Sequence, residues 1–135
     1  MKYLFTFYGE EGEMENASPE EMKEGMERWR AFDREAVEAG AMIACDPLES
    51  SQATTTIRLS EEGEATTTDG PFAESKEQLG GFCLLECKDR EEALEWAGKV
   101  PLRPGAAMEV RPIKDLSQFG RESPTQSPAK AKATA

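Results

Sequence analysis

The chain has 135 residues, the size of one domain, and its 16 basic and 27 acidic side chains give a net charge of −11. A field of this sign repels phosphate backbones and anionic lipid, so we expect neither a nucleic-acid nor a membrane partner. The sequence contains no histidine, which excludes a Ser-His-Asp triad, a His-ligated zinc site and a haem on a proximal histidine; we expect no metal and no cofactor.

The N-terminal third predicts a strand followed by a long helix. Residues 2–8, KYLFTFY, are rich in β-forming side chains and end at Gly9. Ser18 fits the N-cap of the helix, Pro19 its first position, and Glu21 completes a capping box. The apolar residues that follow recur at helical spacing and predict a core-facing stripe: Met22, Met26, Trp29, Phe32 and Ala36.

The rest of the chain predicts five strands and a second helix. Asp89 caps that helix over residues 89–100, with Glu92 in the capping-box position. The strands are expected at residues 41–48, 54–59, 65–69, 80–88 and 107–113. This order indicates an α+β fold of the ferredoxin-like βαββαβ type with an extra short strand or arm. We expect this domain over residues 1–118 and a disordered tail over 119–135, because no Leu, Ile, Val or aromatic residue follows Arg121.

The two most apolar strands predict a dimer. A sheet of this topology carries both helices on one face, and its other face should be polar if it meets water. Residues 3–8 and 81–87 are instead apolar on both sides. We expect a second copy of the sheet to cover this face, which gives a homodimer packed sheet to sheet. The alternative is a monomer with an apolar strand pair.

The same alternation predicts charged side chains between the two sheets. Met108 and Val110 suit the helix side, which places Glu109 and Arg111 on the opposite face. In the strand at 54–59, Ile57 and Leu59 suit the helices, which by the same argument places Arg58 opposite. Charges in a partly buried cleft must pair or bind something ionic. A structural Glu109–Arg111 bridge and ligand recognition are both open.

The stretch from Thr66 to Phe82 contains the most unusual motif. Asp69, Gly70 and Pro71 predict a turn, and we expect Phe72 to fill an apolar pocket beyond it. In one interpretation the stretch is an arm that locks a dimer or rims a barrel. In the other its charged residues line a ligand-binding cleft beside Arg58, Glu109 and Arg111: these are Asp69, Glu74 and Lys76.

The cysteines and the absence of apolar runs predict a cytoplasmic protein. Three cysteines, an odd number, suit a reducing compartment. Cys83 and Cys87 lie four positions apart in one expected strand, roughly 13 Å, too far to pair with each other. We interpret them as core residues, with a redox or metal pair as the weaker alternative. No run approaches the roughly 20 apolar residues that span a bilayer, and no signal-peptide pattern follows Met1.

With these elements placed, TDGPFAESKEQLGGF, followed by DREEALEWA and MEVRPI, resembles the DGPF branch of the YciI-related family. The resemblance covers about residues 1–115 and includes KYLFTFYGEE and LSEEG. It implies a ferredoxin-like fold that dimerises into an α/β barrel. It also implies an accessory role in transcriptional regulation linked to extracytoplasmic-function sigma factors, beside which members are often encoded.

One departure from the family pattern concerns catalysis. Members often carry a histidine shortly before the last strand, where this chain has VPLRPGAAMEV. Asp69 is the remaining candidate acid or base. Three hypotheses follow: a dimer that binds a small polar or anionic ligand between its sheets, an enzyme without cofactor that uses Asp69, and a structural partner protein.

Overall fold

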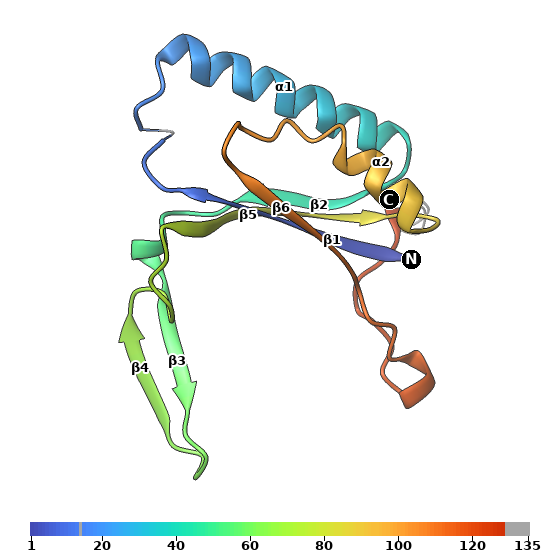
Figure 1. The fold of residues 1–135 in the computed structure, drawn as a ribbon. Coiled ribbons are helices and arrows are strands. Elements are labelled where there is room, and N and C mark those ends of the chain that lie inside the picture. Colours follow the sequence, from blue (N-terminus) through green and yellow to red (C-terminus); the bar gives the residue numbers. More distant parts are fainter. Residues whose placement is uncertain (14, 129–135) are drawn as a thin grey trace.

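The computed structural model describes residues 1–13 and 15–128, and the element order is the one predicted (Figure 1). Within these residues, two α-helices, α1 and α2, accompany six strands and two short 3-10 turns, η1 and η2. Their bounds are β1 Lys2–Glu10, α1 Pro19–Glu38, β2 Met42–Pro47, η1 Ser51–Ala53, β3 Thr55–Leu59, β4 Ala65–Asp69, β5 Glu77–Glu86, α2 Arg90–Ala97, β6 Ala107–Pro112 and η2 Ser117–Phe119.

Four of the strands form one antiparallel sheet in the order β2-β5-β1-β6. With β1, β2, β5 and β6 as its strands, this topology is compatible with the ferredoxin-like fold. Both helices cover the same face of the sheet (Figure 1). The opposite face, which we call the open face, carries no helix among the described residues.

The hairpin β3–β4 is separate from this sheet, and we call it the arm. Its two strands pair with each other, and no other described strand pairs with either. The prediction that Ile57 and Leu59 face the helices is therefore wrong: they are 70% and 72% exposed. The alternation that places a side chain on one face of a strand does not say to which sheet the strand belongs.

Local signals fix the start of both helices. The Ser18 hydroxyl oxygen accepts the Glu21 backbone N–H at 3.1 Å, and the Asp89 carboxylate accepts that of Glu92 at 2.9 Å. These contacts satisfy backbone donors that have no partner inside the helix. Glu92 also accepts the Lys88 backbone N–H at 3.0 Å, so the predicted capping at α2 is confirmed.

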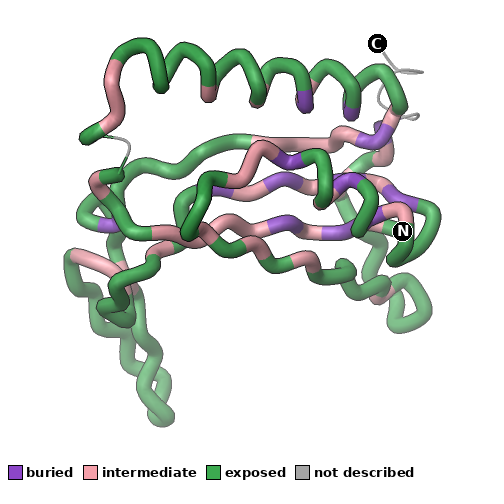
Figure 2. The backbone as a smooth tube through the Cα atoms, turned by 45° about the horizontal axis from the view of Figure 1, so that its top comes forward, coloured by how far each residue is buried: buried purple, intermediate pink, exposed green. Residues whose placement is uncertain are grey.

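The core lies between the sheet and the helices (Figure 2). Phe5 of β1 and Leu85 of β5 are fully buried there. A row of edge-to-face aromatic contacts joins Phe7 to Trp29, Trp29 to Phe32 and Phe32 to Trp96, with ring centroids 5.6, 5.9 and 6.2 Å apart. Such pairs add to the stability from burial alone.

The apolar stripe of α1 is only partly in this core. Phe32 and Ala36 are buried, as predicted, and Trp29 packs against them. Met22 and Met26 are exposed, which contradicts the prediction. Helical periodicity identifies a face of a helix, but the length over which that face is covered depends on the tertiary packing.

The segment after β6 returns to the start of β1. Lys2 accepts the Ile113 backbone N–H at 2.8 Å, and its side chain donates to the Thr125 carbonyl at 2.7 Å. The part that includes η2 lies on the open side of the sheet, at the end opposite the arm (Figure 1). Residues 129–135 of the predicted tail lie outside the described residues, and its disorder stays a prediction.

Candidate functional site

The open face carries the apolar surface that the sequence predicted. Leu4 lies directly opposite Leu84, and Thr6 opposite Phe82, across the β1–β5 pair. All four side chains are partly exposed, whereas their sequence neighbours Tyr3, Phe5, Cys83 and Leu85 are buried toward the helices. Alternation therefore places a leucine and phenylalanine patch on the side of the sheet that no helix covers.

An ion pair lies at the edge of this patch. Glu109 pairs with Thr6 and Arg111 with Leu4 in the β1–β6 register, so both share the open face. The bridge between them, one of the two open alternatives, is present, with 3.7 Å from the Arg111 Nη2 to the Glu109 Oε2. The two side chains are 76% and 54% exposed, so water screens the pair and its contribution to stability is small.

The Asp69-Gly70-Pro71 turn holds the base of the arm. Gly70 has φ of +96°, a conformation that favours glycine. Its N–H donates to the Thr54 carbonyl at 2.7 Å, and its own carbonyl accepts the Thr56 hydroxyl at 2.6 Å. These two hydrogen bonds tie the turn to the start of β3. That the stretch locks a dimer or rims a barrel stays a prediction.

Phe72 does not fill an apolar pocket, and that prediction is wrong. Its side chain is 75% exposed, because the turn directs it to a groove that is open to solvent. The Phe72 carbonyl accepts a hydrogen bond from Arg58 Nη2 at 3.2 Å, which fixes the guanidinium at the base of the arm. The groove has a volume of about 720 Å³. Its lining consists of Leu48, Glu49, Ser50, Ser51, residues 53–58, residues 71–73, Gln78 and Leu79.

The predicted site residues fall into separate groups within one chain. Arg58 and Phe72 meet at the arm, while Glu109 and Arg111 meet on the edge strand β6. Lys76 pairs with Glu10 at 3.6 Å on the surface. Asp69 and Glu74 are exposed and do not line the groove.

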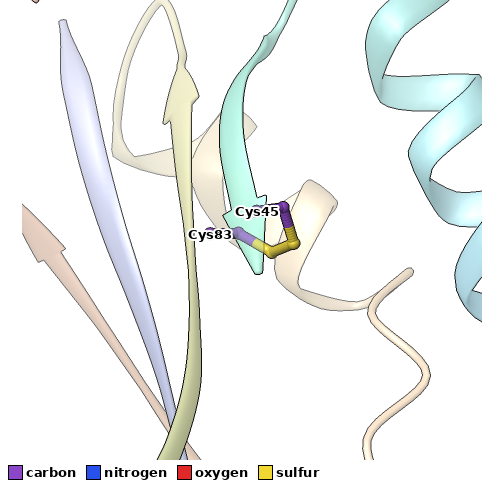
Figure 3. The surroundings of a disulfide bond; sticks show 2 residues. All are labelled: Cys45 and Cys83. Atoms are coloured by element: carbon purple, nitrogen blue, oxygen red, sulfur yellow. A yellow bond between two sulfur atoms is a disulfide. The ribbon is translucent and has the colours of Figure 1, made fainter. Parts of the chain in front are cut away.

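A disulfide links the two strands that lead to and from the arm (Figure 3). Cys45 of β2 and Cys83 of β5 are register partners with Cα atoms 4.0 Å apart. The sequence analysis did not anticipate this bond, because the proximity of the two cysteines depends on a strand register that the sequence does not state; the prediction that Cys83 is a core residue is confirmed. Cys87 is a free, buried cysteine, so the prediction that it does not pair with Cys83 is confirmed.

Glu11 makes a contact that the sequence analysis missed. Its carboxylate accepts the Ser51 backbone N–H at 2.8 Å and the Ser50 hydroxyl at 3.2 Å. Hydrogen bonding from Ser51, through its side chain and its backbone, lowers the pKa of the Glu11 carboxyl. The acidic loop after β1 thus holds the η1 turn, from which the arm begins.

Neither a candidate membrane span nor a candidate metal site lies within residues 1–13 and 15–128. Over this part of the chain, no helix is both long and apolar enough to cross a membrane. Within the same ranges, no group of three or more His, Cys, Asp or Glu side chains could hold a metal ion.

The fold and the open face define a small α+β domain with an inserted hairpin arm. A family model described as the YCII-related domain matches residues 1–117. An uncharacterised protein of Rhizobium meliloti (strain 1021) is 38% identical over 115 residues, which cover 84% of this chain and 92% of that protein. The chain belongs to the YCII-related family.

Proposed function

We propose that the protein is a homodimer whose open sheet faces pack together and enclose a cleft for a small polar or anionic molecule. The observation that carries the proposal is the apolar patch formed by Leu4, Phe82 and Leu84. Complete burial of a fully exposed Leu or Phe side chain contributes roughly 1.5–3 kcal/mol, and these three side chains, which are already partly buried, each contribute a fraction of that. A second copy offers the same patch, so a two-fold arrangement covers both at once.

The ligand class follows from the charges beside the patch. Arg111 is mostly exposed and pairs with Glu109 through one long contact. A guanidinium has five N–H donors, so most of them are available to a carboxylate or phosphate. Packing the sheets together removes water from these groups and strengthens their attraction for an anion.

The other two hypotheses have less support. Asp69 lies at the end of β4, exposed and outside the groove, so its position adds nothing to the enzymatic alternative. The regulatory role linked to sigma factors and the cytoplasmic location stay predictions. The structural hypothesis requires that side chains fill the cleft, and ligand binding separates it from our proposal.

The first test is the oligomeric state. Sedimentation equilibrium of the purified chain should give a dimer, and Leu84→Arg should shift it to monomer because the charge would be buried in the interface. Leu94→Arg is the matched control, since Leu94 is an exposed leucine on α2, on the helix side of the sheet. A wild-type monomer at all concentrations, or equal effects of both variants, would refute the sheet-to-sheet dimer.

The second test is anion binding. Isothermal titration with inorganic phosphate and with succinate should detect binding to the wild type, and Arg111→Gln should weaken it roughly tenfold or more. Arg90→Gln is the matched control, because Arg90 is exposed and lies on α2, on the helix side of the sheet. A dimer that binds neither probe would favour the structural hypothesis.

A further inference from the structure

We propose that the arm of one subunit docks on the C-terminal segment, residues 111–121, of a second copy and so completes the partner's cleft. The proposal rests on the sheet-to-sheet dimer and adds a second, separately testable contact to it. It is carried by three observations: an arm without a covering surface, the positions of the arm and the segment, and their opposite charges.

The arm lacks the covering that a hairpin needs. A two-stranded hairpin alone is marginally stable in water. Ile57 and Leu59 lie on the same face of the arm as their register partners Thr67 and Ala65, and both apolar side chains are at least 70% exposed. All ten residues of β3 and β4 except Thr56 are exposed, and the arm extends away from the domain (Figure 2).

The arm and the segment of one chain cannot meet, but those of two chains can. The arm begins near the β1 end marked by Glu10, and the segment begins at Arg111 and Pro112, the latter of which pairs with Tyr3 at the other end. Nine residues of β1 separate these ends by roughly 30 Å. Both project on the open side (Figure 1). A two-fold axis that lies between the packed faces and runs obliquely to the strands exchanges both the ends and the edges of the sheets, and so can bring each arm to the partner's segment.

The charges of the two surfaces are complementary. The turn of the arm, residues 60–64, holds Glu61, Glu62 and Glu64 and no basic residue. The segment holds Arg111, Lys114 and Arg121 against the single acid Asp115. In a chain of net charge −11, few surfaces attract an acidic turn. Phe119, 74% exposed within the segment, offers an apolar contact for Ile57 and Leu59.

Docking in this way would also bring the predicted site residues together. Arg58 of the arm and Arg111 of β6 lie on different elements at opposite ends and edges of one chain's sheet. With the arm exchanged, Arg58 reaches the side of the cleft where the partner's β6 lies. Each anion-binding cleft then takes groups from both copies.

The test is charge reversal with rescue, measured as the dimer dissociation constant by sedimentation. Glu61→Lys with Glu62→Lys and Glu64→Lys should raise this constant roughly tenfold or more, and so should Lys114→Glu with Arg121→Glu. Mixing the two variant proteins, or combining the changes in one chain, should restore it to within about threefold of the wild type. Glu20→Lys with Glu24→Lys and Glu27→Lys, on the exposed face of α1, is the control of equal charge.

A photo-crosslinking amino acid at position 59 identifies directly the surface that the arm contacts. In a mixture of heavy- and light-isotope protein, the expected product is a hybrid-mass crosslink between the arm and residues 111–121. The arm contact would be refuted if the charge reversals left the dimer dissociation constant unchanged. It would also be refuted by a crosslink within one chain or to another surface. Both outcomes are compatible with the sheet-to-sheet dimer. A monomeric wild type would overturn both the arm contact and that dimer.

Discussion

Reduction of the Cys45–Cys83 disulfide should cost a large part of the stability of this protein. The bond closes a loop over a sequence separation of 38 residues that contains η1, the arm and the Asp69-Gly70-Pro71 turn. The loop-closure entropy for this length corresponds to about 4 kcal/mol at 25 °C. A domain of this size is typically stable by about 5–15 kcal/mol, so the effect should be easy to measure.

Urea unfolding followed by the fluorescence of Trp29 and Trp96 is the assay, with and without a phosphine reductant at one fixed protein concentration. With a urea dependence of about 1–3 kcal/mol per molar, the midpoint should fall by roughly 1 to 4 M on reduction. Cys45→Ser cannot form the bond, and its midpoint should be the same under both conditions. Mass spectrometry after alkylation verifies that reduction was complete.

An unchanged wild-type midpoint after verified reduction would refute this reasoning. A fall of equal size in Cys45→Ser would do so as well, because the reductant would then act elsewhere. Hydrogen exchange locates the change: the loss of protection on reduction should concentrate between Pro47 and Thr54, where the chain leaves β2 for the arm, rather than in α1.

Three further predictions concern single side chains. A Cβ at Gly81 would lie 3.2 Å from the Asp46 carbonyl oxygen, so Gly81→Ala should lower the free energy of unfolding by about 1–3 kcal/mol. Gly80→Ala is the control and should not lower it, because the nearest atom to a Cβ at Gly80 is 3.9 Å away. Equal losses in the two variants would contradict the close approach of β2 to Gly81. Burial, and to a lesser extent Asp46, raises the pKa of Asp33, whose Oδ1 is buried and has no hydrogen-bond partner among the described residues. The folded state therefore holds this proton more tightly than the unfolded chain, and stability falls as pH rises from 3.8 through the raised value. Asp33→Asn should flatten this fall in thermal unfolding across that range; a pH profile parallel to the wild type would exclude Asp33 as its source. Burial raises the pKa of the Cys87 thiol to about 11, with Glu92 adding to the shift, so a thiol reagent at pH 8 should label the non-reduced protein only after unfolding. Rapid labelling of the native protein would contradict this burial.

The sequence by itself determined the local features. Ser18 and Asp89 begin the helices through hydrogen bonds to residues three positions away, so the pattern alone was sufficient. Alternation along β6 correctly separated Met108 and Val110 from Glu109 and Arg111, and it placed the two charged residues on one face, where an ion pair was one of two open alternatives. The motif from Thr68 to Phe82, together with DREEALEWA and MEVRPI, was sufficient to indicate the family.

Only the tertiary structure decided which strands share a sheet and which residues meet across it. Ile57 and Leu59 alternate as core residues do, yet β3 lies in the arm, because strand periodicity is the same in both places. The Cys45–Cys83 bond depends on the register between β2 and β5, which long-range pairing sets. Helix capping needs only neighbours within one helical turn. Strand pairing, and the covering of one element by another, join residues far apart in the chain, so they are decided only when the core assembles.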